Sequence, residues 1–253
     1  MRGALVTGAS RGIGRAAAIA LSGRGERVAV HYGRAREEAE RTLSLLHGEG
    51  HVLVGGDLSD PEAARRIVEE AEAGLGQVNV LVNNAGIAPG PATDHRVDEV
   101  DYATWQQRVA RMLAVDLTAP ANLSYLVARS LIARDAPGVI VNVGSRGAFR
   151  GEPGAPAYAA AKAGLHALGQ SMAVALAPHG IAVASVAPGF VATERQQEKL
   201  TGADGDALRA QSPFGRVGTA EEIADAILYL TSPGAQWASG TILDLNGASH
   251  LRS

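Results

Sequence analysis

The sequence predicts an α/β fold in which a doubly wound parallel sheet carries helices on both faces. Short apolar segments of strand type alternate with helical segments along all 253 residues, which is the pattern of repeated strand and helix units. One of the segments, 78–82, is apolar apart from Asn79 and is of the kind that is buried on both faces of a parallel sheet. No linker or internal repeat divides the chain, so we expect one domain over residues 1–253.

The composition excludes several classes of protein. The formal net charge of -3 lacks the basic excess of a nucleic-acid-binding protein. The sequence contains no cysteine, which excludes disulfides, thiolate nucleophiles and cysteine-ligated zinc, and we expect no metal site. No apolar run reaches the length of a transmembrane helix, and the first residues lack a signal-peptide pattern. We therefore expect a cytoplasmic protein without membrane contacts.

The first strand and helix enclose a glycine-rich turn. The apolar run 3–6 leads into Thr7-Gly8-Ala9-Ser10-Arg11-Gly12-Ile13-Gly14, and an alanine-rich helical segment follows over 15–22. Glycines in this context let the backbone approach a pyrophosphate, which lies at the positive N-terminus of the helix. The turn therefore predicts a dinucleotide site, with the spacing Gly-x-x-x-Gly-x-Gly rather than the commoner G-x-G-x-x-G.

The end of the second strand, 27–31, bears on the choice of cofactor. An acidic residue there would bind the adenosine ribose and repel a 2'-phosphate, but the sequence continues as His31-Tyr32-Gly33-Arg34. Arg11 and Arg34 could instead pair with a 2'-phosphate. We therefore expect NADP(H) rather than NAD(H); the alternative is that both arginines are merely solvated.

The middle of the chain continues the alternation. Asp60 before Pro61 is expected to cap a helix. The polar segment 89–101 has no period and is expected to be a loop at the sheet edge where ligands bind. The other expected elements are a helix over 36–47, a strand over 51–54 and one long helix over 105–134.

The last third adds strands over 139–143, 181–187 and 241–245. The helix between the first two is apolar on almost every side over 159–177, which predicts that a partner subunit covers it. The long polar segment 194–216 is a candidate lid over the ligands. Thr219 and Glu222 are spaced as a capping box for the last large helix.

Three residues form a candidate catalytic set. Tyr158 and Lys162 are four apart, so their side chains share one face of a helix. An ammonium beside a phenol favours the phenolate, which lowers the pKa of the tyrosine toward the working range of a general acid or base. Ser145 follows an apolar strand, where its hydroxyl could hold a substrate carbonyl oxygen.

With this serine and the glycine turn, the sequence resembles the short-chain dehydrogenase/reductase family over nearly the whole chain. The resemblance implies a Rossmann-type, seven-stranded parallel sheet flanked by helices, hydride transfer with Tyr158 as proton donor, and a homotetramer. Asp116 stands where the family has an asparagine next to the lysine. The resemblance implies cofactor contacts from Gly8, Ser10, Arg11, Gly12, Ile13, Gly14, Tyr32, Gly33, Arg34, Asp57, Leu58, Asn84, Ala85, Gly86, Tyr158, Lys162, Pro188, Gly189, Val191 and Thr193.

The motif strings are most similar to those of 3-oxoacyl-(acyl-carrier-protein) reductases, so the expected substrate is a 3-oxoacyl thioester or a related small carbonyl compound, free or bound to a carrier. Carrier docking needs a basic patch, yet the helix after Lys162 has no Lys or Arg through Gly180. A tailoring ketoreductase or alcohol dehydrogenase on a small substrate is the alternative, and a non-catalytic NADP(H) sensor is a further one. Among substrate contacts beside Ser145 and Tyr158, we expect Arg146 or Arg150 to bind an anionic or strongly polar group.

Overall fold

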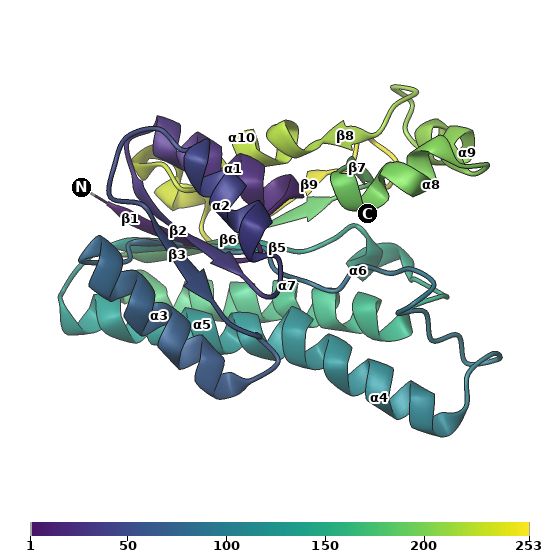
Figure 1. Ribbon diagram of the computed structural model, residues 1–253, viewed down its shortest axis with the longest axis horizontal. Coiled ribbons are helices and arrows are strands. Elements are labelled where there is room, and N and C mark those ends of the chain that lie inside the picture. Colours follow the sequence, from purple (N-terminus) through teal and green to yellow (C-terminus); the bar gives the residue numbers. More distant parts are fainter. Residues whose placement is uncertain (1, 253) are drawn as a thin grey trace.

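The computed structural model describes residues 2–252, apart from the side chains of Arg195 and Glu198. Seven parallel strands form one sheet in the order β3-β2-β1-β4-β5-β6-β9 (Figure 1). The predicted seven-stranded doubly wound sheet is thereby confirmed. The strands are β1 (Gly3–Val6), β2 (Arg27–Tyr32), β3 (Val52–Gly55), β4 (Val80–Asn83), β5 (Gly138–Val143), β6 (Ile181–Pro188) and β9 (Ile242–Leu245).

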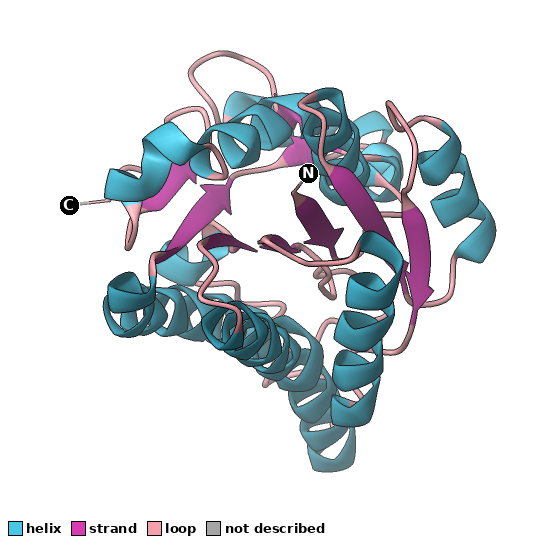
Figure 2. Cartoon of the chain, turned by 90° about the vertical axis from the view of Figure 1, so that its left-hand side faces the viewer, coloured by secondary structure: helices cyan, strands magenta, loops and turns pink. Residues whose placement is uncertain are grey.

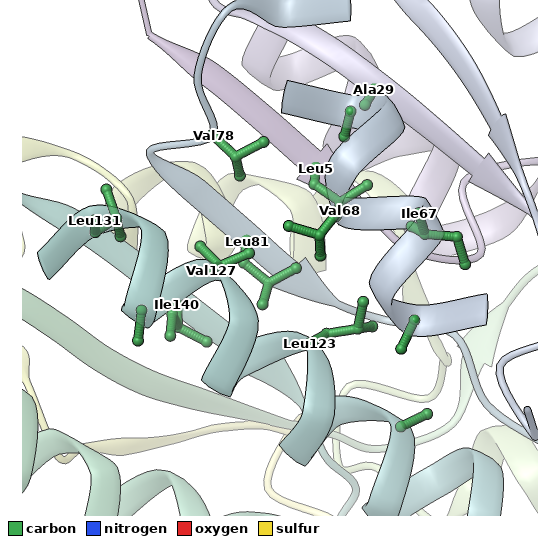
Figure 3. Close-up of a cluster of buried hydrophobic side chains, with 14 of the residues drawn as sticks. Leu5, Ala29, Ile67, Val68, Val78, Leu81, Leu123, Val127, Leu131 and Ile140 are labelled. Atoms are coloured by element: carbon green, nitrogen blue, oxygen red, sulfur yellow. The ribbon is translucent and has the colours of Figure 1, made fainter. Parts of the chain in front are cut away.

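The central strands are apolar at most positions because both faces of the sheet are covered. Successive side chains on a strand point to opposite faces, so Leu5 and Leu81 join one hydrophobic cluster while Val6 and Val82 join the other. Figure 3 shows the first cluster, where Leu5 and Leu81 meet side chains of two helices. Burial on both sides explains why these strands lack the alternating pattern of a half-exposed sheet.

Helices form a layer on each face of the sheet (Figures 1 and 2). One layer holds α1, α2 and α10, and the other holds α3, α4, α5 and α7. The bounds are α1 (Gly12–Gly23), α2 (Arg36–Ser44), α3 (Pro61–Leu75), α4 (Tyr102–Leu113), α5 (Ala119–Ala133), α6 (Gly147–Arg150), α7 (Pro156–Leu176), α8 (Gln197–Thr201), α9 (Gly205–Ala210) and α10 (Ala220–Leu230). The predicted caps are present: the Asp60 side chain accepts a hydrogen bond from the Glu62 N–H, and Thr219 and Glu222 form a capping box.

The predicted helix over 105–134 is wrong in one respect. The chain instead forms α4 and α5, which are joined by a π-helical turn at Ala114–Thr118. One extra residue in a helical turn rotates the side chains that follow it, and such a turn has no signature in the hydrophobic pattern. Smaller differences concern ends: α1 begins at Gly12 rather than residue 15, and α2 ends at Ser44 rather than residue 47.

The fold brings several loops to one edge of the sheet. The chain reverses its strand order between β1 and β4, and in such sheets ligands bind beyond the carboxyl ends of the strands at this point. The candidate lid over 194–216 includes α8 and α9, and it lies between the short strands β7 (Val191–Ala192) and β8 (Gly218–Thr219), which pair with each other. Within residues 2–252, no helix is long and apolar enough to cross a membrane.

Candidate active site

A cleft of about 720 Å³ opens at this edge of the sheet. All but two of the predicted site residues line it, from the glycine loop through Asp116 and Ser145 to Thr193. The exceptions are Gly14 and Tyr32. The Tyr32 ring packs close to Gly55, because neighbouring side chains on a strand point to opposite faces; His31, one position earlier, lines the cleft in its place.

The glycine loop has the close packing that a dinucleotide cradle requires. A Cβ atom on Gly14 would lie 2.5 Å from the Gly8 carbonyl oxygen and 2.5 Å from the Asn84 amide nitrogen. Gly8 and Gly12 have φ values of 62° and 56°, which other residues rarely adopt. The Asn84 amide donates to the carbonyl oxygens of Thr7 and Gly8. Gly14 thus shapes the loop without lining the cleft, and the backbone present fits a bound pyrophosphate.

His31 connects three strand ends beneath this loop. Its Nδ1 accepts a hydrogen bond from the Gly8 N–H, so the proton lies on Nε2, which donates to the Gly56 carbonyl oxygen at 3.1 Å. Burial lowers the pKa of His31 to about 4, so the ring is neutral near neutral pH. From the sequence we could conclude only that the end of β2 has no acidic residue. The structure adds that the His31 side chain hydrogen-bonds to the glycine loop and holds it in place.

The end of the cleft where the adenosine of a dinucleotide is expected is rich in cations. Arg11, Arg34 and Arg111 line it together with Asp57. Neither Arg11 nor Arg34 forms an ion pair with a described carboxylate. Asp57 accepts hydrogen bonds from the Ser59 N–H and hydroxyl, which hold the pKa of its carboxyl below the usual range. Two arginine side chains that line this cleft without an ion pair to a described carboxylate fit an additional phosphate on the ribose.

The fold brings Ser145, Tyr158 and Lys162 together. The Ser145 hydroxyl accepts from the Gly147 N–H at 3.0 Å, which orients it at the end of β5. The Lys162 Nζ lies 5.8 Å from the centre of the Tyr158 ring and donates to the Val143 carbonyl oxygen at 3.1 Å. The predicted oxygen anchor, proton donor and cation thus share one wall of the cleft.

Asp116 approaches the same lysine. Its Oδ1 lies 3.2 Å from the Lys162 Nζ, and its Oδ2 accepts from the Ile87 N–H. The Asp116 side chain is fully buried, and Lys162 is 6% exposed. A Cβ atom on Gly86 would come within 2.6 Å of Asp116 Oδ1, so a glycine at this position is needed for the approach. The contact places a carboxyl oxygen of Asp116 directly beside the Lys162 amino group.

Burial raises the pKa of the Tyr158 phenol. The Lys162 ammonium and a hydrogen bond with Ser145 act in the opposite direction, as the sequence predicted, but they do not outweigh the desolvation. The carboxylates of Asp116 and Glu152 raise the pKa further. The expected net lowering of this pKa is therefore wrong for the isolated chain, because sequence spacing gives the neighbouring charge but not the burial.

Replacing Asp116 by Asn tests this electrostatic coupling. In the alcohol oxidation that the sequence resemblance implies, Tyr158 accepts a proton and must be ionised, so activity is expected to rise with pH through its pKa. Removing the Asp116 charge lowers that pKa, and we expect the oxidation profile of Asp116→Asn to move toward lower pH. The exposed Asp225→Asn on α10 serves as the control. An unchanged profile for Asp116→Asn would show that Asp116 is protonated in the native protein.

Several lining residues carried no signal in the sequence. Glu152, Lys199 and Gln211 border the cleft, the last two from α8 and the residue after α9, so the candidate lid does contribute to the site. His166, one turn beyond Lys162 on α7, stacks on Phe149 at 5.3 Å, and burial lowers its pKa to about 4. Only the long-range packing shows that these side chains meet the catalytic segment.

Comparison with known proteins gives consistent results. Residues 8–250 match the family model described as enoyl-(acyl carrier protein) reductase. The chain is 35% identical over 98% of its length to L-rhamnose 1-dehydrogenase (NAD(P)(+)) of a Sphingomonas species, covering 95% of that protein. It is 36% identical, over 98% of its length and 97% of the relative, to 3-oxoacyl-(acyl-carrier-protein) reductase of Escherichia coli.

A third relative is cis-4-hydroxycyclohexanecarboxylate dehydrogenase of Sinomonas cyclohexanicum, 37% identical over 97% of this chain and 95% of that protein. Among solved structures, a short-chain dehydrogenase/reductase mutant from Serratia marcescens superposes with a TM-score of 0.86 at 32% identity, covering 98% of this chain and 97% of the other. The overall fold described above is therefore shared with a protein of known structure.

Proposed function

The chain belongs to the short-chain dehydrogenase/reductase family, and from this we propose that it is an NADP(H)-dependent oxidoreductase that interconverts a ketone and a secondary alcohol. The carrying observation is the placement of Ser145, Tyr158 and Lys162 on one wall of a cleft that also contains the glycine loop. We propose that residues 1–253 act as one domain in this reaction.

Each catalytic side chain has a distinct part. Ser145 holds the substrate oxygen, and Tyr158 donates a proton to it during reduction or removes one during oxidation. Lys162 stabilises the tyrosinate and binds the cofactor ribose. The nicotinamide supplies or accepts the hydride when bound, while the protein orients the reactants and polarises the carbonyl.

The cofactor assignment to NADP(H) rests on charge. No acidic side chain stands at the end of β2, and Arg11 and Arg34 line the adenosine end of the cleft without an ion pair to a described carboxylate. A charge-assisted contact to a 2'-phosphate would use this free charge, whereas the ribose hydroxyl of NAD(H) would not.

Two substrate classes fit the proposed reaction. A 3-oxoacyl thioester is suggested by the similarity to the E. coli reductase. A small cyclic or sugar-like alcohol is suggested by the L-rhamnose and 4-hydroxycyclohexanecarboxylate dehydrogenases. The exposed face of α7 has no basic side chain for docking of an acidic carrier, which favours the small substrate.

The same helix supports an oligomer. Ala160, Ala167 and Val174 lie seven residues apart on α7 and are exposed, Val174 to 80%. Small apolar side chains in one stripe of a helix fit a helix of another subunit. We propose a cytoplasmic homotetramer with α7 at an interface; a monomer mass by light scattering would contradict it.

The decisive experiment is a turnover assay with purified protein and NADPH. The panel contains acetoacetyl-CoA, ethyl acetoacetate, 4-oxocyclohexanecarboxylate and its methyl ester, and the readout is oxidation of NADPH together with identification of the alcohol. We expect turnover of at least one ketone. Tight NADPH binding with no hydride transfer to any of them would favour the alternative, a sensor that binds the cofactor without catalysis.

A further inference from the structure

Next to the catalytic serine, two arginines converge on one neutral side chain. Arg146 is 8% exposed, and its Nη2 donates to Gln211 Oε1 at 2.8 Å. The Nη1 of Arg150 lies 3.5 Å from the same oxygen, and Arg146 also donates to the Ser249 hydroxyl. All these hydrogen-bond partners are uncharged. We refer to Arg146 and Arg150 together as the arginine pair.

The arginine pair has no ionic partner among the described side chains. Other partly buried arginines do have one: Arg15 pairs with Glu38 and Glu194, and Arg24 pairs with Glu26. Glu152 acts on Arg146 only from beyond ion-pair distance, and burial and the charge of Arg150 both oppose its effect by lowering the pKa of the Arg146 guanidinium. A buried cation that lacks a counter-ion is costly, and an incoming anion would remove this cost.

The arginine pair is also accessible to a ligand. Both residues line the catalytic cleft together with Ser145 and Tyr158. Arg146 in addition borders a second cavity of about 270 Å³, which shares Leu208 and Gln211 with the cleft. Arg146 therefore borders both cavities although only 8% of its surface is exposed.

From these observations we propose that the substrate carries a carboxylate close to its reacting carbon and that the arginine pair binds this carboxylate. A guanidinium group binds a carboxylate with two parallel hydrogen bonds, which fixes orientation as well as affinity. This inference names the substrate class of the proposed oxidoreductase and rests on that proposed function.

The distance from the serine argues for a small substrate. Arg146 follows Ser145 directly in the chain and both residues line the same cleft, so an anion bound by Arg146 shares this part of the cleft with the oxygen that Ser145 holds. The phosphate of a phosphopantetheine arm is at the far end of a long flexible chain from a 3-oxo group. A keto or hydroxy acid with a short chain or small ring satisfies this spacing.

The test compares acids with their esters. With NADPH, kcat/KM is measured for 4-oxocyclohexanecarboxylate and its methyl ester, and for acetoacetate and ethyl acetoacetate. Of the two acids, the one with the higher kcat/KM is expected to be a better substrate of the wild type than its own ester. Arg146→Gln or Arg150→Gln should reduce the ratio of the kcat/KM values for this acid and its ester by about tenfold to a hundredfold, mainly by raising KM for the acid. Arg146→Lys should keep part of the ratio, and Arg65→Gln, on the exposed face of α3, should keep all of it.

A binding measurement separates this inference from the proposed function. Calorimetry with the NADPH complex uses cyclohexanecarboxylate, which cannot be reduced, and its methyl ester. Tighter binding of the acid by the wild type, lost in Arg150→Gln, supports the arginine pair even if no ketone is turned over. Equal binding of the acid and the ester, or equal kcat/KM values for an acid and its ester, overturns the inference about the arginine pair. In that case, turnover of the ester still supports the proposed oxidoreductase function.

Discussion

The variant Tyr158→Phe is expected to reduce ketones about 100- to 10,000-fold more slowly than the wild type, the usual contribution of a positioned general acid. The loss is expected because the phenol lies beside Ser145 and Lys162 on this wall of the cleft and is the proposed proton donor to the substrate oxygen. The measurement is kcat with NADPH and the best ketone of the panel, and NADPH binding is followed separately by fluorescence.

The control for this variant is Tyr229→Phe, which removes a hydroxyl from an exposed tyrosine on α10. It should keep the wild-type rate. Thermal unfolding of both variants shows whether the fold is intact. If Tyr158→Phe retains kcat within about tenfold of the wild type while it binds NADPH normally, another group donates the proton and the proposed role of Tyr158 is wrong.

The second large effect concerns the choice of cofactor. We expect the wild type to prefer NADPH over NADH in kcat/KM, and the double variant Arg11→Ala, Arg34→Ala to lose most of this preference. Each charge-assisted contact to a 2'-phosphate is worth roughly 1.5 to 3 kcal/mol, so about tenfold to a hundredfold is lost per arginine. NADH kinetics should change little, because its ribose carries no phosphate for these side chains.

The single variants show whether the two arginines act together, since neighbouring charges on one ligand are rarely additive. Arg65→Ala on α3 is the control, because Arg65 is an exposed arginine outside the cleft. A wild-type enzyme that works better with NADH would contradict the assignment. If the double variant still prefers NADPH, another cationic side chain of the cleft contacts the 2'-phosphate, and Arg111 is the candidate.

Much of the fold follows from local patterns. Apolar runs such as 78–82 indicate buried strands, and the glycine turn after the first strand requires backbone conformations that few other residues adopt. The four-residue spacing of Tyr158 and Lys162 places both on one helical face wherever that helix lies. These features depend on neighbours in the chain, and they suffice for the sheet architecture and for the central catalytic set.

The electrostatic state of the site depends on contacts between segments far apart in the chain. The π-helical turn at Ala114–Thr118 places Asp116 against Lys162, and desolvation of the Tyr158 phenol in the packed site raises its pKa. Arg146 meets Gln211 and Ser249, which are 65 and 103 residues away. The protonation and pairing of these side chains depend on burial and on neighbours from distant segments. These contacts form only when the helices and the candidate lid pack against the sheet, whereas the periodicity of the sequence describes one helix or strand at a time.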